Sequence, residues 1–490
     1  MKPRPAPGVL LVLAALLLVI HTLTNGRYGF HRDELATLDD AWHLAWGYVA
    51  YPPLTPFVAR IALTLFGAAP AAIRFFAALA QCVAVVVAGL MARELGGGQT
   101  AQIVAALAVA VSPLSMLWGH SFQYVSFDFL WGVLAVYFVI RLIESNDGRW
   151  WIAVGAAVGL GLMTRYTIVW LVAGLTVGFL LTPARKLLLS KWLIAVAALA
   201  ILIFLPNLLW QVNHGFISID FLRAIHARDI RIGRTDGFWW KQLVVPANLF
   251  TVPLWIAGLL FYFRRKEGQR YRALGWTFIA ALAFFAVARA REYYTAPLYP
   301  MLLAAGAVLA QQWPRWAKGL NWAGLIVAFG LGVAFLPVAS VNSKWFQVEM
   351  RFNETLREEI GWPELVDTIA KIHESLPVNE RSTAGILTGN YGEAGAIDLY
   401  GPAHGLPLAL SRVNSFWLRG YGEHPPQTLI VVGLSPQFVQ DNFASCESRG
   451  TISNRYGVPN EETEVHKYLW VCRGLREPWP EFWRKIKAWG

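Results

Sequence analysis

The chain has 490 residues, of which 56% are hydrophobic and only 15% are charged, whereas soluble domains carry about 25% charged residues. Its 23 Trp residues are typical of a protein with many membrane–water interfaces, where indole rings settle. This composition excludes an ordinary soluble protein and indicates a polytopic membrane protein. The net charge of +11 is no sign of nucleic-acid binding until topology places the charges, and we expect no nucleic-acid partner.

The chain begins with a basic stretch and an apolar run. No small-x-small cleavage site follows, so we interpret this segment as a retained signal anchor. A spanning helix needs about 20 largely apolar residues. We therefore expect a mainly α-helical bundle of about eleven transmembrane helices, at 8–24, 70–92, 101–118, 125–143, 150–163, 166–182, 192–210, 242–263, 273–289, 294–311 and 320–338.

The loop charges orient these segments. With the N-terminus in the cytoplasm, the densest basic loops all fall on the cytoplasmic side, as the positive-inside rule requires. They are 141–149, 183–191, 264–272 and 313–318. Residues 150–182 can alternatively form one long span that contains Arg165, but 264–272 would then lie outside, so two spans are preferred. We expect a bacterial inner-membrane protein whose loops 25–69 and 211–241, and everything after about residue 340, are periplasmic.

Residues 341–475 differ in composition from the membrane part, residues 1–340. Short β-like runs alternate with helical patterns, which predicts a small periplasmic α/β domain. Cys446 and Cys472 fall in it, whereas Cys82 lies in a span. Two cysteines in an exported domain are compatible with a disulfide, and two unpaired thiols are the alternative.

The tail, residues 476–490, has an amphipathic pattern. One face of a helix here would carry the five apolar residues Trp479, Phe482, Trp483, Ile486 and Trp489, with basic residues opposite. This pattern predicts an interfacial helix that returns to the membrane. The alternative is an ordinary surface helix packed on the α/β domain.

The first acidic cluster follows the first span directly, in GFHRDELATLDD (29–40). Apolar residues recur at helical spacing through this stretch and beyond it, so we expect a helix lying on the membrane surface. Asp33 and Glu34 fall in its first turn, where the helix dipole favours negative charge, and this structural interpretation needs no function. The functional interpretation is a partly desolvated carboxylate, which has a raised pKa and makes a competent general base. Asp39 and Asp40 are interpreted as a solvated face.

Several cations lie on the side where the positive-inside rule disfavours them. Arg165 sits in a tight turn between two spans, and Arg289 and Arg291 sit in another. The loop 211–241 holds further basic side chains, among them Arg223, His226, Arg228, Arg231, Arg234 and Lys241. Arginine pairs bidentately with phosphate, so a site for an anionic phospholipid-like ligand follows, and snorkelling to lipid head groups is the alternative. An external base beside such cations indicates group transfer from a lipid phosphate, such as a polyprenyl-phosphate sugar.

Five stretches occur in a telling order: DELATLDDAWHLAWGYVAYPPL (33–54), ARELGG (92–97), FLPNLLWQVNHGF (204–216), RAIHARD (223–229) and REYYTAPLYP (291–300). Together they resemble bacterial glycosyltransferase family 39, the protein O-mannosyltransferase-like members of the GT-C membrane glycosyltransferases. The resemblance covers about residues 8–340 and is much weaker beyond them. It implies a GT-C helical bundle with interfacial helices in the first external loop. It also implies transfer of a sugar from polyprenyl phosphate, usually with inversion.

The resemblance also implies roles for individual residues. Asp33 corresponds to the family's base, and Glu34 to its partner, which orients the acceptor or a metal ion. The family often has Lys where this chain has Arg165 and Arg291, a change that keeps the charge. The candidate donor-phosphate site comprises Arg165, Arg289, Arg291, Tyr293 and Tyr294. The candidate sugar- or acceptor-binding residues are His43, Tyr51, Gln123, Tyr124, Asp128 and His226, with His120 nearby. For Gln123, Tyr124 and His120 the alternative is a polar group at a helix end.

These assignments give a single displacement in which Asp33 takes the proton of an acceptor hydroxyl while Arg165 and Arg291 stabilise the departing polyprenyl phosphate. A divalent metal ion, Mg²⁺ or Mn²⁺, can share that task with Glu34 as its ligand, although the chain has no tight His/Cys ligand spacing. The acceptor is a hydroxyl of a lipid, a glycan or a protein. One alternative is a flippase or transporter of a lipid-linked sugar, although no internal repeat is evident. Another is a sensor or assembly factor whose α/β domain binds a partner.

Overall fold

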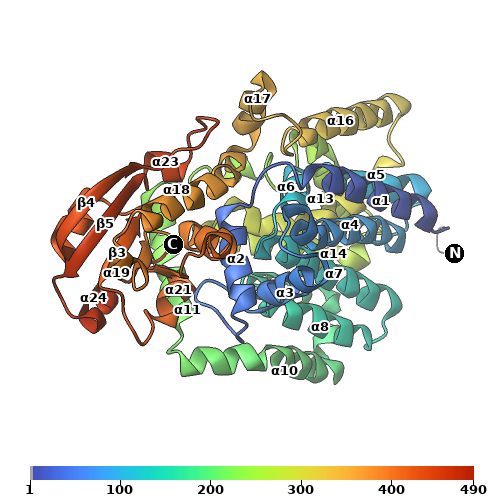
Figure 1. Ribbon diagram of the computed structural model, residues 1–490. Coiled ribbons are helices and arrows are strands. Elements are labelled where there is room, and N and C mark those ends of the chain that lie inside the picture. The colour runs from blue at the N-terminus through green and yellow to red at the C-terminus, as the bar shows by residue number, and fades with distance from the viewer. Residues whose placement is uncertain (1–3) are drawn as a thin grey trace.

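The computed structural model describes residues 4–490, with a helical bundle at one end of the molecule and a mixed sheet at the other (Figure 1). The bundle and its loops contain α1 (Pro7–Thr24), α2 (Arg32–Trp42), α3 (Leu54–Phe66), α4 (Pro70–Glu94), α5 (Gln99–Ala110), α6 (Pro113–His120), α7 (Tyr124–Ser145), α8 (Trp150–Leu162), α9 (Ile168–Leu180), η1 (Pro183–Leu189), α10 (Trp192–Asn213), α11 (Ile217–Arg231), α12 (Phe238–Lys241), η2 (Leu249–Thr251), α13 (Val252–Arg264), η3 (Gln269–Tyr271), α14 (Arg272–Val287), η4 (Glu292–Leu298), α15 (Tyr299–Ala310) and α16 (Arg315–Val333).

The rest of the chain is called the sheet unit below. It contains α17 (Lys344–Phe352), η5 (Glu354–Glu359), α18 (Trp362–Glu374), α19 (Val378–Arg381), β1 (Gly385–Thr388), α20 (Tyr391–Tyr400), η6 (Gly401–His404), β2 (Ala409–Ser411), α21 (Asn414–Arg419), β3 (Thr428–Val432), α22 (Pro436–Asn442), β4 (Phe443–Thr451), α23 (Glu461–Glu464), β5 (Tyr468–Leu475) and α24 (Trp479–Lys485).

Each of the eleven apolar segments contains a helix. Six helical segments between residues 4 and 490 are long and apolar enough to cross a membrane: α1, α4, α7, α10, η4 with α15, and α16. The number rises to eight if α5 with α6, bent by 60°, and α9 with η1, bent by 117°, each count as one span. The chain is a multi-pass membrane protein, and the number of eleven spans stays a prediction. The single long span over 150–182 is wrong, because α8 ends at Leu162, α9 begins at Ile168, and Arg165 lies between them.

The sheet has the strand order β2-β1-β3-β5-β4. Strand β1 pairs in parallel with β2 and β3, whereas β5 pairs antiparallel with β3 and β4. Strands β1, β3 and β5 coincide with the β-like runs STAGILT (382–388), TLIVVG (428–433) and YLWVC (468–472) of the sequence. One hydrophobic core continues from the bundle into the sheet unit, since Leu35 of α2, Ile369 of α18, Ile397 of α20 and Ile430 of β3 belong to the same buried cluster. The boundary near residue 340 is therefore not a gap between two cores.

The two cysteines of the sheet unit are bridged. Cys446 and Cys472 lie directly opposite each other on β4 and β5 and form a disulfide, so the expected bridge is confirmed. The tail differs from its prediction. Phe482, Trp483 and Ile486 of the α24 region are buried in a cluster with apolar side chains of the strands. Because the sheet already covers this face, the tail is a helix packed on the sheet unit and not an interfacial helix.

A fully buried ion pair joins the bundle to the first external loop. Arg74 of α4 donates to both carboxylate oxygens of Glu34, at 2.8 and 2.6 Å, and neither side chain is exposed. The same guanidinium donates to two carbonyl oxygens of the loop after α1 and lies 3.4 Å from Glu359 of η5. Glu359 in turn contacts His120 at the end of α6, at 2.8 Å. One arginine thus fixes α1, α2, α4 and the start of the sheet unit together.

We expect Arg74→Met to lower the free energy of unfolding by about 3–5 kcal/mol, because removing one partner leaves Glu34 charged and buried without compensation. Unfolding of the purified protein in mixed detergent micelles measures this change. Arg149→Met is the matched control, since Arg149 pairs with Asp147 on the exposed surface and its loss should leave stability unchanged. Equal stability of Arg74→Met and wild type would show that the pair does not support the fold.

Candidate functional site

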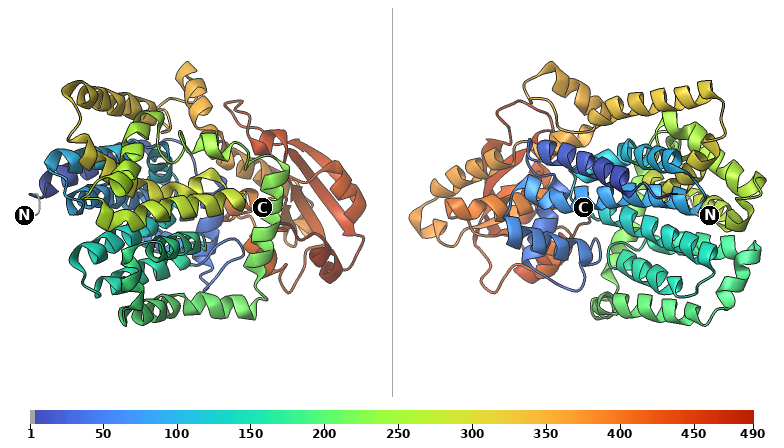
Figure 2. Two further views of the ribbon diagram at one scale, coloured as in Figure 1. Left: turned by 180° about the vertical axis from the view of Figure 1, so that it is seen from behind. Right: turned by 90° about the vertical axis from the view of Figure 1, so that its right-hand side faces the viewer.

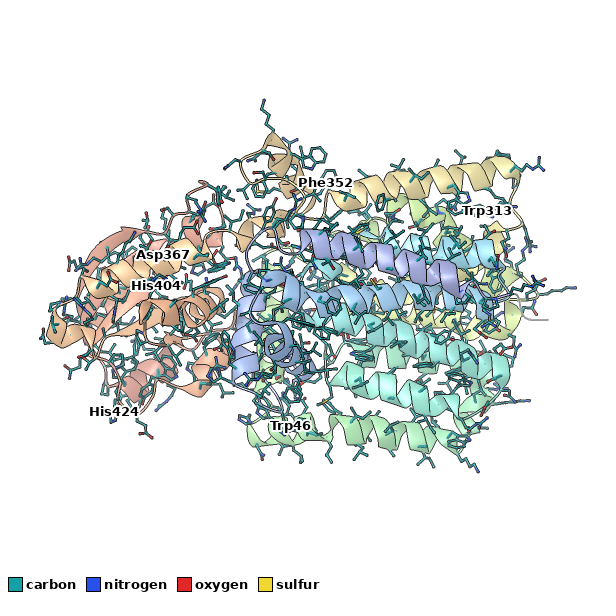
Figure 3. The ribbon with its side chains drawn as sticks, turned by 45° about the vertical axis from the view of Figure 1, so that its right-hand side comes forward. Trp46, Trp313, Phe352, Asp367, His404 and His424 are labelled. Carbon is teal, nitrogen blue, oxygen red and sulfur yellow. A yellow bond between two sulfur atoms is a disulfide. The ribbon has the colours of Figure 1, made fainter. Side chains whose placement is uncertain are left out.

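A cavity of about 480 Å³ lies where the bundle meets the sheet unit. Its walls come from α2, the loop around Tyr51, the start of α7, the turn between α8 and α9, helix α11 and the turn before η4. Helices α20 and α21 close it from the sheet unit. Figure 2 shows α11 crossing the end of the bundle beside the sheet. Figure 3 places Trp46 near this end of the bundle and Trp313 at the other, as is usual for Trp at the two membrane interfaces.

Asp33 lies in the first turn of α2 and lines the cavity. Its side chain is 40% exposed. The hydroxyl of Tyr391 donates a hydrogen bond to Oδ1 at 2.7 Å, and Oδ2 lies 3.8 Å from Nδ1 of His31. Helix α2 starts here because the His31 ring accepts from the backbone N–H of Asp33, and Glu34 accepts from the backbone N–H of His31. Asp33 is thus held in place and still reachable from the cavity, which suits a general base.

Glu34 is placed differently from its expected role as partner of the acceptor or of a metal ion. It points away from the cavity and is 0% exposed. Beyond its two bonds from Arg74, it accepts from the backbone N–H groups of Phe122 and His31, at 2.7 and 2.8 Å. These donors occupy both oxygens, so the expectation is corrected: Glu34 is an anchor for α2.

Asp39 and Asp40 are not a solvated face, contrary to the sequence interpretation. They are 0% and 4% exposed. Arg419 of α21 donates to both carboxylates, and Tyr51 donates to Oδ2 of Asp40 at 2.8 Å. Burial raises the pKa of Asp40 to about 6, against the opposing charge of Arg419. The sequence misses this cluster because its cation lies in the sheet unit, 380 residues from Asp39.

Arg165 is buried in the cavity wall at 9% exposure. Its guanidinium lies over the ring of Tyr124, 3.9 Å from the ring centre, and donates to the hydroxyl of Tyr294 at 2.9 Å. Its Nε has no hydrogen-bond partner within residues 4–490. The guanidinium is thus held in the cavity wall by an aromatic face and a phenol, and no hydrogen bond to a carboxylate is found for it within residues 4–490.

Arg291 also lines the cavity, but a carboxylate partly neutralises it. Asp229 of α11 accepts from its Nε at 2.6 Å, and the hydroxyl of Tyr293 lies 3.1 Å from its Nη1. Tyr293 therefore acts through Arg291 and does not line the cavity itself. Arg289, the third arginine of the candidate donor site, lies outside the cavity. Its side chain is 57% exposed and lies 3.8 Å from Asp236.

Some of the other candidate residues line the cavity and others do not. Four of the sugar- or acceptor-binding candidates line the cavity: Tyr51, Gln123, Tyr124 and His226. Asp128 lies in a smaller pocket beside it, where it accepts from Thr167 at 3.0 Å. His43 is outside the cavity and contacts Asp39. His120 lies 2.8 Å from Glu359 and so belongs to the buried cluster of charged residues around Arg74 and Glu34.

The sheet unit contributes lining residues that were not predicted: Tyr391, Asn414, Ser415 and Phe416. No motif in the sequence marks them, because they come together with Asp33 only through tertiary packing. Arg228 and Arg234 also line the cavity. These two belong to the external cations of the loop 211–241, which was the signal that pointed to them.

Comparisons with known proteins bear on what this cavity does. A family model described as dolichyl-phosphate-mannose-protein mannosyltransferase matches residues 50–210. Lipid A galacturonosyltransferase RgtD of Rhizobium johnstonii is 26% identical over 353 residues, which are 69% of this chain and 72% of that protein. Both comparisons indicate a GT-C family glycosyltransferase.

Two solved structures of another membrane glycosyltransferase share the fold of this chain. Apo ArnT from Cupriavidus metallidurans has a TM-score of 0.62 at 15% identity, and the match covers 95% of this chain and 98% of ArnT. The structure of the same ArnT bound to undecaprenyl phosphate has a TM-score of 0.57 at 14% identity, with the same coverage of both chains. The family that the sequence motifs indicate is confirmed.

The residues that the structure describes contain no evident set of ligands for a metal ion. Within residues 4–490, no three His, Cys, Asp or Glu side chains gather in a metal-binding arrangement. Glu34, the expected ligand, is taken by Arg74. The use of Mg²⁺ or Mn²⁺ stays a prediction, and Glu34 is not its ligand.

As the pH rises from about 4 to about 6, we expect the melting temperature of the wild-type protein to fall relative to the melting temperature of Asp40→Asn. Burial raises the pKa of Asp40 from 3.8 to about 6. The protonated carboxyl therefore contributes stability that is fully present below about pH 4 and is lost as the pH rises through about 6.

Thermal unfolding in detergent at a series of pH values measures this difference. Asp236→Asn is the control, because that side chain is 71% exposed and lies 3.8 Å from the exposed Arg289, and its curve should run parallel to that of wild type. Parallel curves for Asp40→Asn and wild type would show that the fold does not favour the protonated form of Asp40.

Proposed function

We propose that this glycosyltransferase moves a sugar, with inversion, from a polyprenyl-phosphate donor to a hydroxyl group of a lipid or glycan at the periplasmic face of the bacterial inner membrane. One observation carries the proposal. A single cavity holds a reachable carboxylate, Asp33, and a buried guanidinium with an uncommitted Nε, that of Arg165. A base and an anion-binding group that face one space are the two parts that a single displacement needs.

The relatives support the chemical class of both substrates. Undecaprenyl phosphate bound to ArnT supports a polyprenyl phosphate as the carrier of the sugar. The name of RgtD, a lipid A galacturonosyltransferase, supports a glycolipid acceptor. The cavity of about 480 Å³ is within the range of about 300–1,000 Å³ that is usual for small-molecule sites, which gives room for a sugar phosphate.

The displacement follows from the two groups. The acceptor hydroxyl transfers its proton to Asp33 while its oxygen attacks the anomeric carbon of the donor sugar. The bond from the anomeric carbon to the phosphate oxygen breaks, and its electron pair leaves with the polyprenyl phosphate. Arg165 and Arg291 stabilise the charge that develops on that phosphate. The attack comes from the face opposite the leaving group, so the configuration inverts.

We expect Asp33→Asn to lower the rate of transfer about 10²- to 10⁴-fold, the usual contribution of a general base. An amide cannot take the acceptor proton but keeps the shape of the side chain. The measurement uses the full chain in liposomes with a polyprenyl-phosphate sugar labelled in the sugar and a glycolipid acceptor, and it follows labelled glycolipid and free polyprenyl phosphate.

The matched control for this variant is Asp236→Asn. Asp236 lies outside the cavity on the same side of the bundle, and its side chain is 71% exposed. Transfer by Asp33→Asn at the wild-type rate would show that Asp33 is not the base. A wild-type protein that moves labelled donor across the bilayer but releases no polyprenyl phosphate would be a transporter instead.

We expect Arg165→Met to lower kcat about 10²- to 10³-fold, because a donor to the departing phosphate acts mainly in the transition state. Arg165→Lys should retain part of the rate, since it keeps the charge but loses the bidentate geometry. Arg223→Met is the control, because Arg223 is 78% exposed at its side chain and lies outside the cavity. A loss as large in Arg223→Met would reveal a general charge effect and contradict a specific phosphate contact.

A further inference from the structure

The hydrogen bond from Tyr391 to Asp33 joins the sheet unit to the catalytic carboxylate. The two residues are 358 positions apart in the chain, and both line the cavity. Within residues 4–490, no other hydrogen bond to the Asp33 carboxylate is found. We infer that Tyr391 is a positioning residue that fixes the Asp33 carboxylate for proton transfer, so that the sheet unit completes the catalytic site. The inference rests on the proposed role of Asp33 and deepens it.

Local sequence fixes where Tyr391 stands. Asn390 caps α20 by accepting from the backbone N–H of Glu393, and Glu393 accepts from the backbone N–H of Asn390. This reciprocal cap sets the first helical position, which is Tyr391. The hydroxyl is therefore carried by a rigid helix start and not by a loose loop.

Two glycines let α20 lie directly against α2. A Cβ atom at Gly392 would stand 2.7 Å from Cβ of Arg32. A Cβ atom at Gly395 would stand 2.7 Å from the backbone carbonyl of Leu35. Both contacts are too short for any side chain, so only glycine permits this separation of the helices. The distance from Tyr391 to Asp33 thus follows from backbone packing.

A second contact holds the same end of α2. Arg32, the neighbour of Asp33, donates to Glu358 at 2.7 Å and to Glu461, which both belong to the sheet unit. Its side chain is 12% exposed, so these pairs are largely shielded from water. The sheet unit therefore grips α2 on both sides of the position that carries the base.

The chemistry of Tyr391 suits a fixed donor. Burial raises the pKa of Tyr391 well above 10, and the charge of Asp33 adds to this effect. The phenol therefore keeps its proton at any working pH and does not compete for the acceptor proton. It occupies Oδ1 of Asp33 and leaves Oδ2 for the acceptor hydroxyl.

The test is Tyr391→Phe in the full chain, assayed in liposomes with the labelled polyprenyl-phosphate sugar and glycolipid acceptor. The ring stays and only the hydroxyl is lost. We expect kcat to fall about 10- to 100-fold, with an unchanged KM for the donor. Tyr456→Phe, at an exposed site of the sheet unit, should behave as wild type.

A double variant separates positioning from a structural role. If Tyr391 acts through Asp33, adding Tyr391→Phe to Asp33→Asn should cause no further loss of kcat. An equal loss in both backgrounds, or a wild-type kcat in Tyr391→Phe, would overturn the inference while leaving the role of Asp33 intact. Wild-type transfer by Asp33→Asn alone would instead overturn the proposed function, and this inference with it.

Discussion

The site depends on the buried pair between Glu34 and Arg74. Successive residues of an α-helix point about 100° apart, because the helix has 3.6 residues per turn. Drawing Glu34 into the bundle, where Arg74 and two backbone N–H groups hold it, therefore turns Asp33 toward the cavity. Two adjacent acids that look alike in sequence receive opposite tasks. Glu34 is buried, where its hydrogen bonds from Arg74 and two backbone N–H groups offset the desolvation cost, and Asp33 stays reachable from the cavity.

The sheet unit is a wall of the site and not an appendage of the bundle. Helix α20 brings Tyr391 to Asp33, while α21 brings Arg419 to Asp39 and Asp40. Both contacts fall on α2, which also carries Glu34 and lines the cavity. A shift of the sheet unit would move all these groups together, because they share a continuous core. The membrane bundle supplies the cavity cations Arg165 and Arg291. The contact between the bundle and the sheet unit supplies the surroundings of Asp33, the proposed base.

The features that could be predicted from the sequence are those that depend on residues close together in the chain. Periodicity showed the helix that carries Asp33 and three of the strands. Loop charges favoured the break around Arg165, and the expected export of Cys446 and Cys472 made their disulfide plausible. What failed was burial, which depends on partners far along the chain. Asp39 and Asp40 carry no local sign of Arg419, and the apolar face of α24 fits a membrane or a sheet equally well. Tyr391 could not be predicted as a site residue for the same reason, since only the packing of α20 on α2 brings its hydroxyl to Asp33.

The distribution of charge in the cavity explains why it would select a lipid phosphate. Most buried ions here are paired within the protein: Asp39 and Asp40 with Arg419, and Arg291 with Asp229. Arg165 differs, because it donates to a phenol and lies over an aromatic ring, while the nearby carboxylate of Asp128 accepts its hydrogen bond from Thr167. Burying a guanidinium costs desolvation free energy. A bound phosphate would offset part of that cost, which is a physical reason to expect an anionic carrier beside Arg165.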